Sequence, residues 1–240
     1  GWCLLVSPGQ MAGSRPLAPE DLESVPTIEL LNELKRRHHL LGRPPARVAL
    51  LGPPCVGKRL QAEVLRRASG ACRITAQDLA AQASSGTGST DARATAALVA
   101  LLERPQCRRG FVLEGLPSTV AQAARFQEAL EKRGTPLESA VFLEAPEDVL
   151  LQRSQGRLVH TASGRRYHEQ LKPPADEGLD DYTGEALERL PRDEAANQHY
   201  RENAGLLSEF FKRAGLAREV TAVGSPDEVA TACSEAAKKQ

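Results

Sequence analysis

A turn bracketed by two glycines, Gly52 and Gly57, carries Lys58 directly behind it. The apolar run Arg47–Leu51 precedes this turn, and the segment Leu60–Leu65 with a helical pattern follows it. A strand–turn–helix corner of this kind directs backbone N–H groups and the positive end of the helix dipole at an anion, to which the lysine adds a charge. The pattern predicts a phosphate-binding turn, and its alternative is an ordinary corner without a ligand.

The residue after the lysine does not suit a magnesium ion. Phosphate turns that bind Mg²⁺ carry a serine or threonine hydroxyl directly after the lysine. This chain continues with Arg59 and Leu60, neither of which can ligate a metal. We therefore expect Mg²⁺ to fit this turn poorly.

The bulk composition is that of an ordinary globular protein, with 41% hydrophobic and 26% charged residues in a chain of 240. Thirty-one basic and 31 acidic residues give zero net charge, so no overall field attracts nucleic acid. The longest apolar runs have the length of strands, which argues against an integral membrane protein. Any anion must therefore bind through a local site.

The cysteines predict a reducing, intracellular compartment. Five are present, an odd number with wide spacing and no C-x-x-C pair, which argues against a disulfide framework and against a zinc site. The chain opens at Gly1, and a presequence cleaved there would favour a mitochondrial over a cytoplasmic location.

Short apolar or β-branched runs alternate with segments of helical pattern, which predicts an α/β fold with a parallel sheet covered by helices on both faces. Residues 1–45 are expected to form an N-terminal extension with one docking helix from Thr27, and residues 46–240 the core. The predicted strands are Val48–Leu51, Cys72–Thr75, Phe111–Leu113, Val141–Leu143 and Val220–Val223, and the clearest helices Ala121–Lys132 and Glu147–Gln155.

Two polar stretches interrupt this alternation. Residues 82–90 are low in apolar content and predict a flexible loop. Residues 158–193 form a second irregular block, rich in turn residues, of the kind that often serves an enzyme as a lid.

Several runs of this sequence resemble those of the long-form adenylate kinases, and they occur in the same order along the chain. Gly110–Ala123 is similar to the family's G-F-x-L-D-G-F-P-R-T-x-x-Q-A, and Arg153–Arg157 is similar to the R-x-x-G-R that opens its lid. The remaining similar runs are the lid segments Ser163–His168, Pro173–Pro174 and Asp180–Glu185, and a leading helix, Val25–Leu31, that resembles mitochondrial-type plant and algal members.

The resemblance covers residues 47 to about 223 and implies a fold. That fold is P-loop nucleoside-monophosphate-kinase-like: a parallel five-stranded sheet with helices on both faces, plus a lid insertion at 158–193. The monophosphate-binding segment, 76–105, is shorter here than in the family.

Four lid residues occupy the positions where other family members hold zinc with four cysteines. Here they are His160, Ser163, Asp180 and Thr183. One imidazole, two hydroxyls and one carboxylate favour a hydrogen-bond network over a metal ion, so we predict no zinc.

The resemblance implies roles in nucleotide binding for seven residues. Lys58, Arg153 and Arg157 would supply cations to a triphosphate. Gln122 would contact the adenine of AMP, and Glu114 stands for an aspartate of the family. Together with two turn glycines the set is Gly52, Gly57, Lys58, Glu114, Gln122, Arg153 and Arg157.

Four arginines of the family's active site are missing from their positions. Two that would hold the acceptor phosphate are replaced by Ala80 and Ser118. A third falls at Leu190, but Arg189 and Arg192 flank it and a shifted loop could restore one. A fourth falls in an apparent deletion between Asp193 and Tyr200.

Two glycines of the family's phosphate turn are also replaced, by Cys55 and Arg59. Their side chains stand where the backbone must approach phosphate closely. Cys55 is either an inert small residue or a reactive thiol, and Arg59 is a candidate to fill the anion site from within the protein.

The losses predict weak or absent kinase activity, because each lost phosphate contact commonly removes about 3 kcal/mol of transition-state stabilisation. The expected function is therefore that of a catalytically impaired adenylate-kinase-like protein, a structural or regulatory subunit of a larger assembly with other protein subunits as partners. That assembly is mitochondrial if a presequence is cleaved before Gly1. The alternatives are an active ATP-dependent adenylate kinase and a sensor that binds ATP or ADP without turnover.

Overall fold

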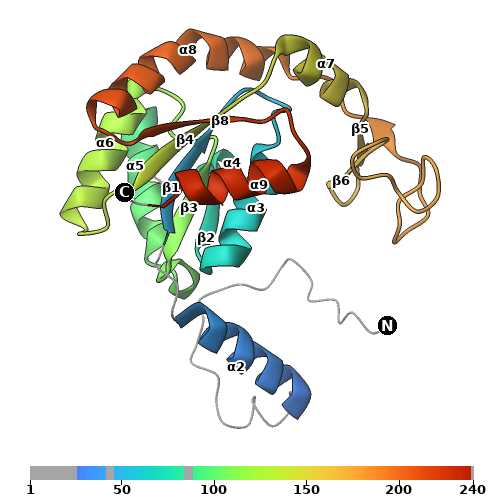
Figure 1. Cartoon of the computed structure of the whole chain (residues 1–240), viewed down its shortest axis with the longest axis horizontal. Helices are drawn as coiled ribbons and strands as arrows, with labels where there is room; N and C mark the ends of the chain where they lie inside the picture. Colours follow the sequence, from blue (N-terminus) through green and yellow to red (C-terminus); the bar gives the residue numbers. More distant parts are fainter. Residues whose placement is uncertain (1–25, 42–45, 84–88, 239–240) are drawn as a thin grey trace. The chain divides into compact units, whose positions relative to one another are not determined.

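The computed structural model describes residues 26–41, 46–83 and 89–238. The chain divides into two compact units, 1–44 and 45–240 (Figure 1). The predicted irregular extension before residue 26 and the centre of the predicted 82–90 loop lie outside the described residues. None of the described helices is long and apolar enough to cross a membrane.

The described part of the first unit is one helix, α2 (Thr27–Leu41), which begins at the threonine where the sequence places its start. Its apolar side chains Ile28, Leu31 and Leu34 are exposed. Docking of this helix on a partner surface stays a prediction.

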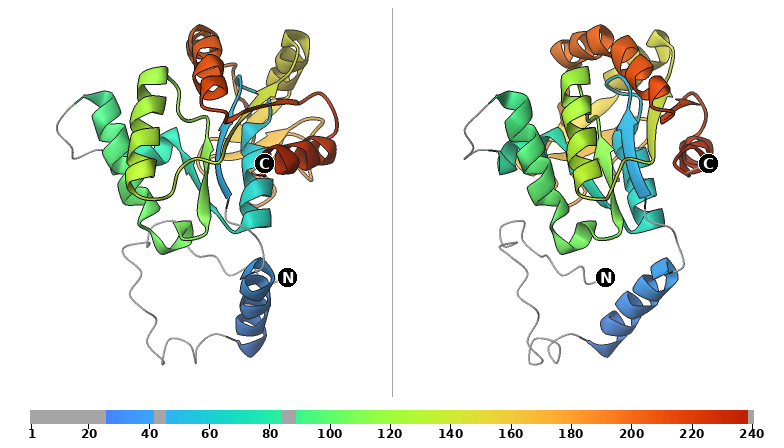
Figure 2. Two further views of the ribbon diagram at one scale, coloured as in Figure 1. Left: turned by 60° about the vertical axis from the view of Figure 1, so that its left-hand side comes forward. Right: turned by 90° about the vertical axis from the view of Figure 1, so that its left-hand side faces the viewer.

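Five parallel strands form the main sheet of the second unit, in the order β2–β3–β1–β4–β8 (Figure 2). The central strand β1 pairs with both β3 and β4, so the turn that follows it lies at the middle of the carboxyl edge of the sheet. The predicted α/β fold is confirmed. The strands are β1 (Ala46–Leu51), β2 (Cys72–Thr75), β3 (Gly110–Glu114), β4 (Ser139–Glu144) and β8 (Ala217–Thr221).

Helices cover both faces because the central strands are apolar on both sides. Val48 and Leu50 of β1 face a cluster with α3 (Lys58–Ser69) and α9 (Pro226–Ala236), to which α7 (Glu147–Gln155) adds Leu150. Ala49 and Leu51 face the other cluster. Each fully buried aliphatic side chain stabilises the fold by about 1.5–3 kcal/mol. The helices of this second cluster are α4 (Ala76–Gln82), α5 (Thr90–Leu102), α6 (Val120–Lys132) and α8 (Glu194–Arg213).

Side-chain caps start the helices that follow the sheet edge. Thr75 ends β2, and its hydroxyl accepts the backbone N–H of Asp78 while the Asp78 carboxylate accepts the N–H of Thr75, which starts α4 without a loop. Thr119 and Asp193 cap α6 and α8 in the same way, each accepting one backbone N–H. The caps fix where the chain turns away from the candidate site.

A disulfide joins Cys72 to Cys107, so the prediction from cysteine spacing is wrong for this pair. Cys72 begins β2, and Cys107 ends the short 3₁₀ helix η1 (Pro105–Cys107) before β3. Since β2 and β3 are neighbours, the fold brings the two Cα atoms to 4.8 Å although 35 positions separate them in sequence. The argument for a reducing compartment loses its basis.

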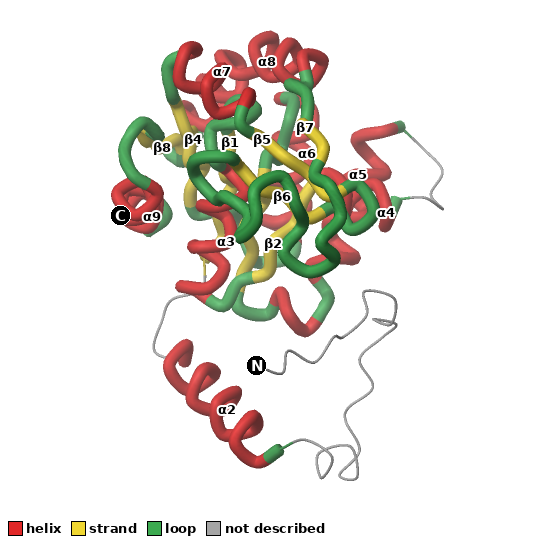
Figure 3. Tube along the Cα trace, turned by 90° about the vertical axis from the view of Figure 1, so that its right-hand side faces the viewer, coloured by secondary structure: helices red, strands yellow, loops and turns green. Residues whose placement is uncertain are grey.

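The lid contains a small antiparallel sheet, in the order β6–β5–β7 (Figure 3). Its strands are β5 (Arg157–His160), β6 (Arg165–His168) and β7 (Glu188–Arg189). The cross-strand partners Leu158 and Tyr167 are buried and give the sheet an apolar side. The prediction of an irregular block at 158–193 is therefore wrong for these strands, and turns fill the stretch between β6 and β7.

Candidate functional site

The turn between β1 and α3 requires both of its glycines. Gly52 has a φ of +150°, and a Cβ atom there would lie 2.7 Å from the carbonyl oxygen of Leu143. Gly57 has a φ of +103° and precedes the first residue of α3. Side chains are strained at such φ values, and at Gly52 a backbone atom also blocks the space. The amino end of α3 therefore opens on a close-fitting backbone turn.

Cys55 occupies a left-handed position in the same turn, with a φ of 68°, and no other described residue except glycine has a positive φ. A side chain is strained in this conformation. The Cys55 sulfur accepts a hydrogen bond from Nη1 of Arg157 at 3.4 Å. The first residue of the lid sheet is thereby linked to the turn.

The Lys58 ammonium group folds back over the turn, where Nζ donates to the carbonyl oxygens of Gly52 at 2.6 Å and Pro53 at 2.7 Å. Burial removes water from this group and lowers the pKa of Lys58 to about 8. Glu114 opposes that shift and Arg157 adds to it. An anion in the turn would favour the charged lysine.

Arg153 and Arg157 flank the short link at Gly156, where α7 ends and β5 of the lid begins. Both side chains contact the turn. Arg153, on α7, donates from Nη1 to the carbonyl oxygen of Val56 at 3.2 Å and from Nη2 to that of Ala222 at 2.8 Å. Arg157, on β5, reaches the turn through Cys55. Both predicted cations therefore lie beside the turn, together with Lys58.

The oxygen ligands that Mg²⁺ requires do not come together at this turn. Glu114 ends β3, but its Oε2 lies 3.4 Å from Nη1 of Arg73 and is otherwise buried without a hydrogen bond. Leu60, one of the two residues after the lysine, is half exposed and apolar. Because Mg²⁺ binds through oxygen ligands, the residues present do not fit it.

Positions 80 and 118, on the predicted AMP-binding side, carry no cationic group, whereas the family has an arginine at each. Ala80 lies exposed on α4. Ser118 donates its backbone N–H to Oε1 of Gln122 at 2.8 Å, which holds the Gln122 amide at the start of α6. A methyl group and a hydroxyl cannot bind phosphate as a guanidinium does.

The four lid residues selected from the sequence lie in one cluster. Nδ1 of His160 is 2.7 Å from Oγ of Ser163, and the Thr183 hydroxyl donates to Oδ2 of Asp180 at 3.1 Å. His160 Nδ1 lies 3.8 Å from Oδ1 of Asp180. Sequence reasoning missed Glu185, whose Oε2 lies 2.5 Å from Nε2 of His160, and the side chains of Arg165 and Tyr167, which contact Asp180. These contacts join the residues in one hydrogen-bond network. The absence of zinc stays a prediction.

Asp180 is the best-satisfied carboxylate of the lid. Arg165 donates to it twice, from Nε at 2.8 Å and from Nη2 at 2.6 Å, and Tyr167 donates its hydroxyl at 3.0 Å. The N–H groups of Tyr182 and Thr183 complete the set. These donors, the guanidinium first among them, hold the pKa of Asp180 far below its ordinary value.

Replacing Asp180 by asparagine is expected to loosen the lid while leaving the main sheet intact, because an amide cannot accept both Arg165 hydrogen bonds. Amide hydrogen exchange should rise over residues 157–189 and stay unchanged in β1. The control is Asp176→Asn, an exposed carboxylate in the same lid. Equal exchange in the two variants would contradict this role.

The same carboxylate predicts an acid-sensitive lid. Because the folded pKa of Asp180 lies below the unfolded value of about 3.9, its contribution is present at neutral pH and is lost as pH falls below about 4. Protection of the lid amides, measured against exchange of the unfolded chain at the same pH, should therefore fall more steeply on acidification in the wild-type chain than in Asp180→Asn.

His168 fastens the lid to α7. Its Nε2 donates to the carbonyl oxygen of Arg153 at 3.0 Å, while Nδ1 accepts the N–H groups of Gln170 and Leu171 at 3.1 and 3.2 Å. This pattern assigns the proton to Nε2. The ring covers Gly156, where a Cβ atom would lie 2.6 Å from Cε1 of His168.

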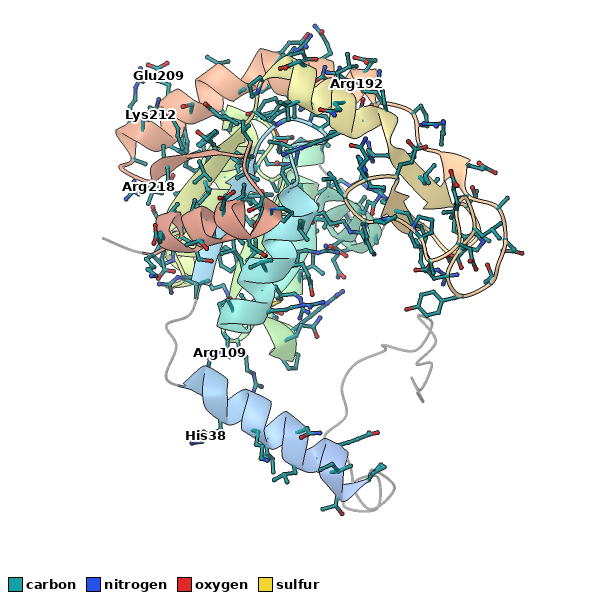
Figure 4. All side chains as sticks on the ribbon, turned by 45° about the vertical axis from the view of Figure 1, so that its right-hand side comes forward. His38, Arg109, Arg192, Glu209, Lys212 and Arg218 are labelled. Carbon is teal, nitrogen blue, oxygen red and sulfur yellow. A yellow bond between two sulfur atoms is a disulfide. The ribbon has the colours of Figure 1, made fainter. Side chains whose placement is uncertain are left out.

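Two further arginines lie near the site: Arg192, which the sequence offered as a replacement for the family arginine at Leu190, and Arg201, which it did not indicate. Arg192 and Arg201 both pair with Glu147 at the start of α7, the second at 3.0 Å, and Figure 4 shows Arg192 beside that helix. Glu147 is the main cause of a raised Arg192 pKa, and Cys55 of the turn contributes. Arg201 lies on α8, which runs unbroken from Glu194 to Arg213. Its contact with Glu147 shows its place near the site, whereas its spacing along the chain does not.

Comparison with known proteins gives one family. The model of the adenylate kinase active-site lid matches residues 157–189. Adenylate kinase 4 of Oryza sativa subsp. japonica is 35% identical over 185 residues, which cover 71% of this chain and 76% of that protein. Adenylate kinase 3 of the same plant is 32% identical over 229 residues, covering 87% and 95%. Adenylate kinase 4 of Arabidopsis thaliana is 35% identical over 193 residues, covering 74% and 78%.

Proposed function

The chain belongs to the adenylate kinase family, and from this premise we propose that it binds an adenine nucleoside triphosphate between turn and lid and transfers the terminal phosphoryl group to AMP at a low rate. The observation that carries the proposal is the convergence of Lys58, Arg153 and Arg157 on the single turn Gly52–Gly57. Three elements, α3, α7 and β5, bring these cations to the amino end of one helix.

Charge neutralisation is the main chemistry that these residues can supply. Phosphoryl transfer spreads negative charge over the transferring group and needs little covalent help from the protein. Lys58 can exchange its two carbonyl partners for phosphate oxygens, and Arg157 can leave the Cys55 sulfur for the same purpose. Arg192 and Arg201 would join them only by leaving Glu147.

The acceptor side accounts for the low rate. Ala80 and Ser118 leave the phosphate of AMP without the guanidinium groups that position it for in-line attack. Gln122 still presents an amide to a base. We infer weak binding and poor alignment of AMP, not loss of the nucleotide cleft.

A coupled assay of ADP formation from ATP and AMP tests the proposal. We expect turnover well below the typical kinase range of about 1–100 s⁻¹, and no turnover in Lys58→Ala. The matched control is Lys132→Ala, an exposed lysine on α6 whose ammonium pairs only with Glu128 among the described residues. Turnover that survives in Lys58→Ala would contradict the assignment of the site.

Exposed apolar groups favour a second candidate, a structural or regulatory subunit with protein partners. Ile28 and Leu34 of α2 are 61% and 63% exposed. A groove of about 480 Å³ between α6 and α8 is lined in part by Val120, Leu206 and Phe210. Binding of nucleotide without turnover would favour a regulatory sensor, and absence of both would favour a structural subunit. A mitochondrial location belongs to this second candidate and is a proposal with it.

A further inference from the structure

Four cations from three elements crowd the mouth of the phosphate turn. Lys58 and Arg59 begin α3, Arg157 begins β5 and Arg166 lies on β6 of the lid. Burial lowers the pKa of Arg166, and the charges of Arg59 and Arg157 lower it further. Arg157 acts on Lys58 in the same direction. Arg157 and Arg166 lie on the same face of the lid sheet, because their cross-strand partners His168 and Val159 stand two positions apart in the β5–β6 ladder. Arg157 reaches the turn through Cys55, so this face of the lid is turned toward the start of α3.

Little negative charge balances this group. In the described part of the chain the guanidinium groups of Arg59 and Arg166 make no hydrogen bond or ion pair, and that of Arg157 contacts a thiol. Glu114 favours the charged forms of Lys58 and Arg166, but its carboxylate also faces Arg73 at 3.4 Å. An excess of unpaired cations at a helix amino end is a binding site for a polyanion.

The same arrangement disfavours a divalent cation. Arg59 replaces a glycine of the family's turn, and Leu60, the residue after it, carries no hydroxyl. A Mg²⁺ ion carried in on a triphosphate would meet no oxygen ligand from these two residues. It would also be repelled by their neighbours, because like charges at short range raise each other's energy.

We propose that Arg59 and Arg166 take over the neutralisation of the β- and γ-phosphates that Mg²⁺ usually provides, so that the cleft binds metal-free ATP in preference to its magnesium complex. Arg59 approaches from the amino end of α3, and Arg166 from the lid. A triphosphate without metal carries more negative charge and matches the four cations better. The inference rests on the proposed nucleotide cleft and adds the ionic form of its ligand.

Calorimetric titration of the full chain with ATP, once with a chelator and once with excess Mg²⁺ at equal ionic strength, tests the preference. Ionic strength must match because salt screens exposed charges. We expect the metal-free nucleotide to bind about tenfold more tightly, the difference that one charge-assisted contact commonly gives.

Two single variants assign the effect to its residues. Arg59→Gln and Arg166→Gln should each weaken metal-free binding by about tenfold and change binding of the magnesium complex much less. The matched control is Arg108→Gln, an exposed arginine just before β3, at the opposite edge of the sheet. It should change neither titration.

The outcomes separate this inference from the proposed function. Tighter binding of the magnesium complex, or equal affinity for both forms, would overturn the inference and leave the nucleotide cleft in place. Absence of binding in both titrations would overturn the cleft itself. The wild-type titrations need no substitution, so misfolding of a variant cannot change the outcome of that comparison.

Discussion

Reduction of the Cys72–Cys107 disulfide is expected to lower the free energy of unfolding by about 4 kcal/mol, because the unfolded chain regains the freedom of a closed loop spanning 35 positions. Typical domains are stable by about 5–15 kcal/mol, so the effect is a large share of the total. Urea unfolding with and without a thiol reductant measures it. The slope of the transition should increase on reduction, since an open unfolded chain exposes more surface.

Two variants separate the disulfide from general effects of the reductant. Cys72→Ala/Cys107→Ala should unfold at the same urea concentration in both conditions. Cys55→Ser removes a free cysteine and should respond to reductant as the wild type does. Equal midpoints for oxidised and reduced wild-type protein would show that the bond contributes nothing to stability.

Introducing arginine at positions 80 and 118 is expected to raise kcat/KM for AMP by about a hundredfold, because a single donor to developing charge is commonly worth a factor of 10² to 10³. Ala80→Arg/Ser118→Arg should act on the acceptor and leave the affinity for ATP unchanged. Initial rates over a series of AMP concentrations, at saturating ATP, give the value.

An added charge far from the cleft is the necessary control. Gln106→Arg lies exposed in η1, before β3 at the amino edge of the sheet. It should leave kcat/KM for AMP unchanged. A similar gain in this variant, or no gain in the double variant, would refute the proposal that positions 80 and 118 limit the use of AMP.

Features that depend on local pattern were predictable from the sequence. The strand Cys72–Thr75 has the predicted bounds, and β1 extends the predicted run by two residues, to Ala46, because pairing with β3 continues through Gly110. The family resemblance is confirmed by relatives that cover most of the chain. The site roles taken from it stay predictions.

Features that depend on which elements become neighbours were not predictable. The Cys72–Cys107 pair forms because β2 lies beside β3, a fact that spacing along the chain does not carry. Arg201 is eight residues beyond the Asp193 cap and meets Glu147 only because α8 passes α7. Glu185 joins His160 across a turn of the lid. In each case the contact is tertiary, and no local pattern encodes it.

His168 covers Gly156, the residue that lies between α7 with Arg153 and β5 with Arg157. His168 hydrogen-bonds the last turn of α7, where Arg153 donates to Val56 and Ala222 of the main body, whereas Arg157 belongs to the lid sheet. The two guanidinium groups beside the turn are therefore anchored in different parts of the fold. An anion that bridges them would join the lid sheet to the body of the protein.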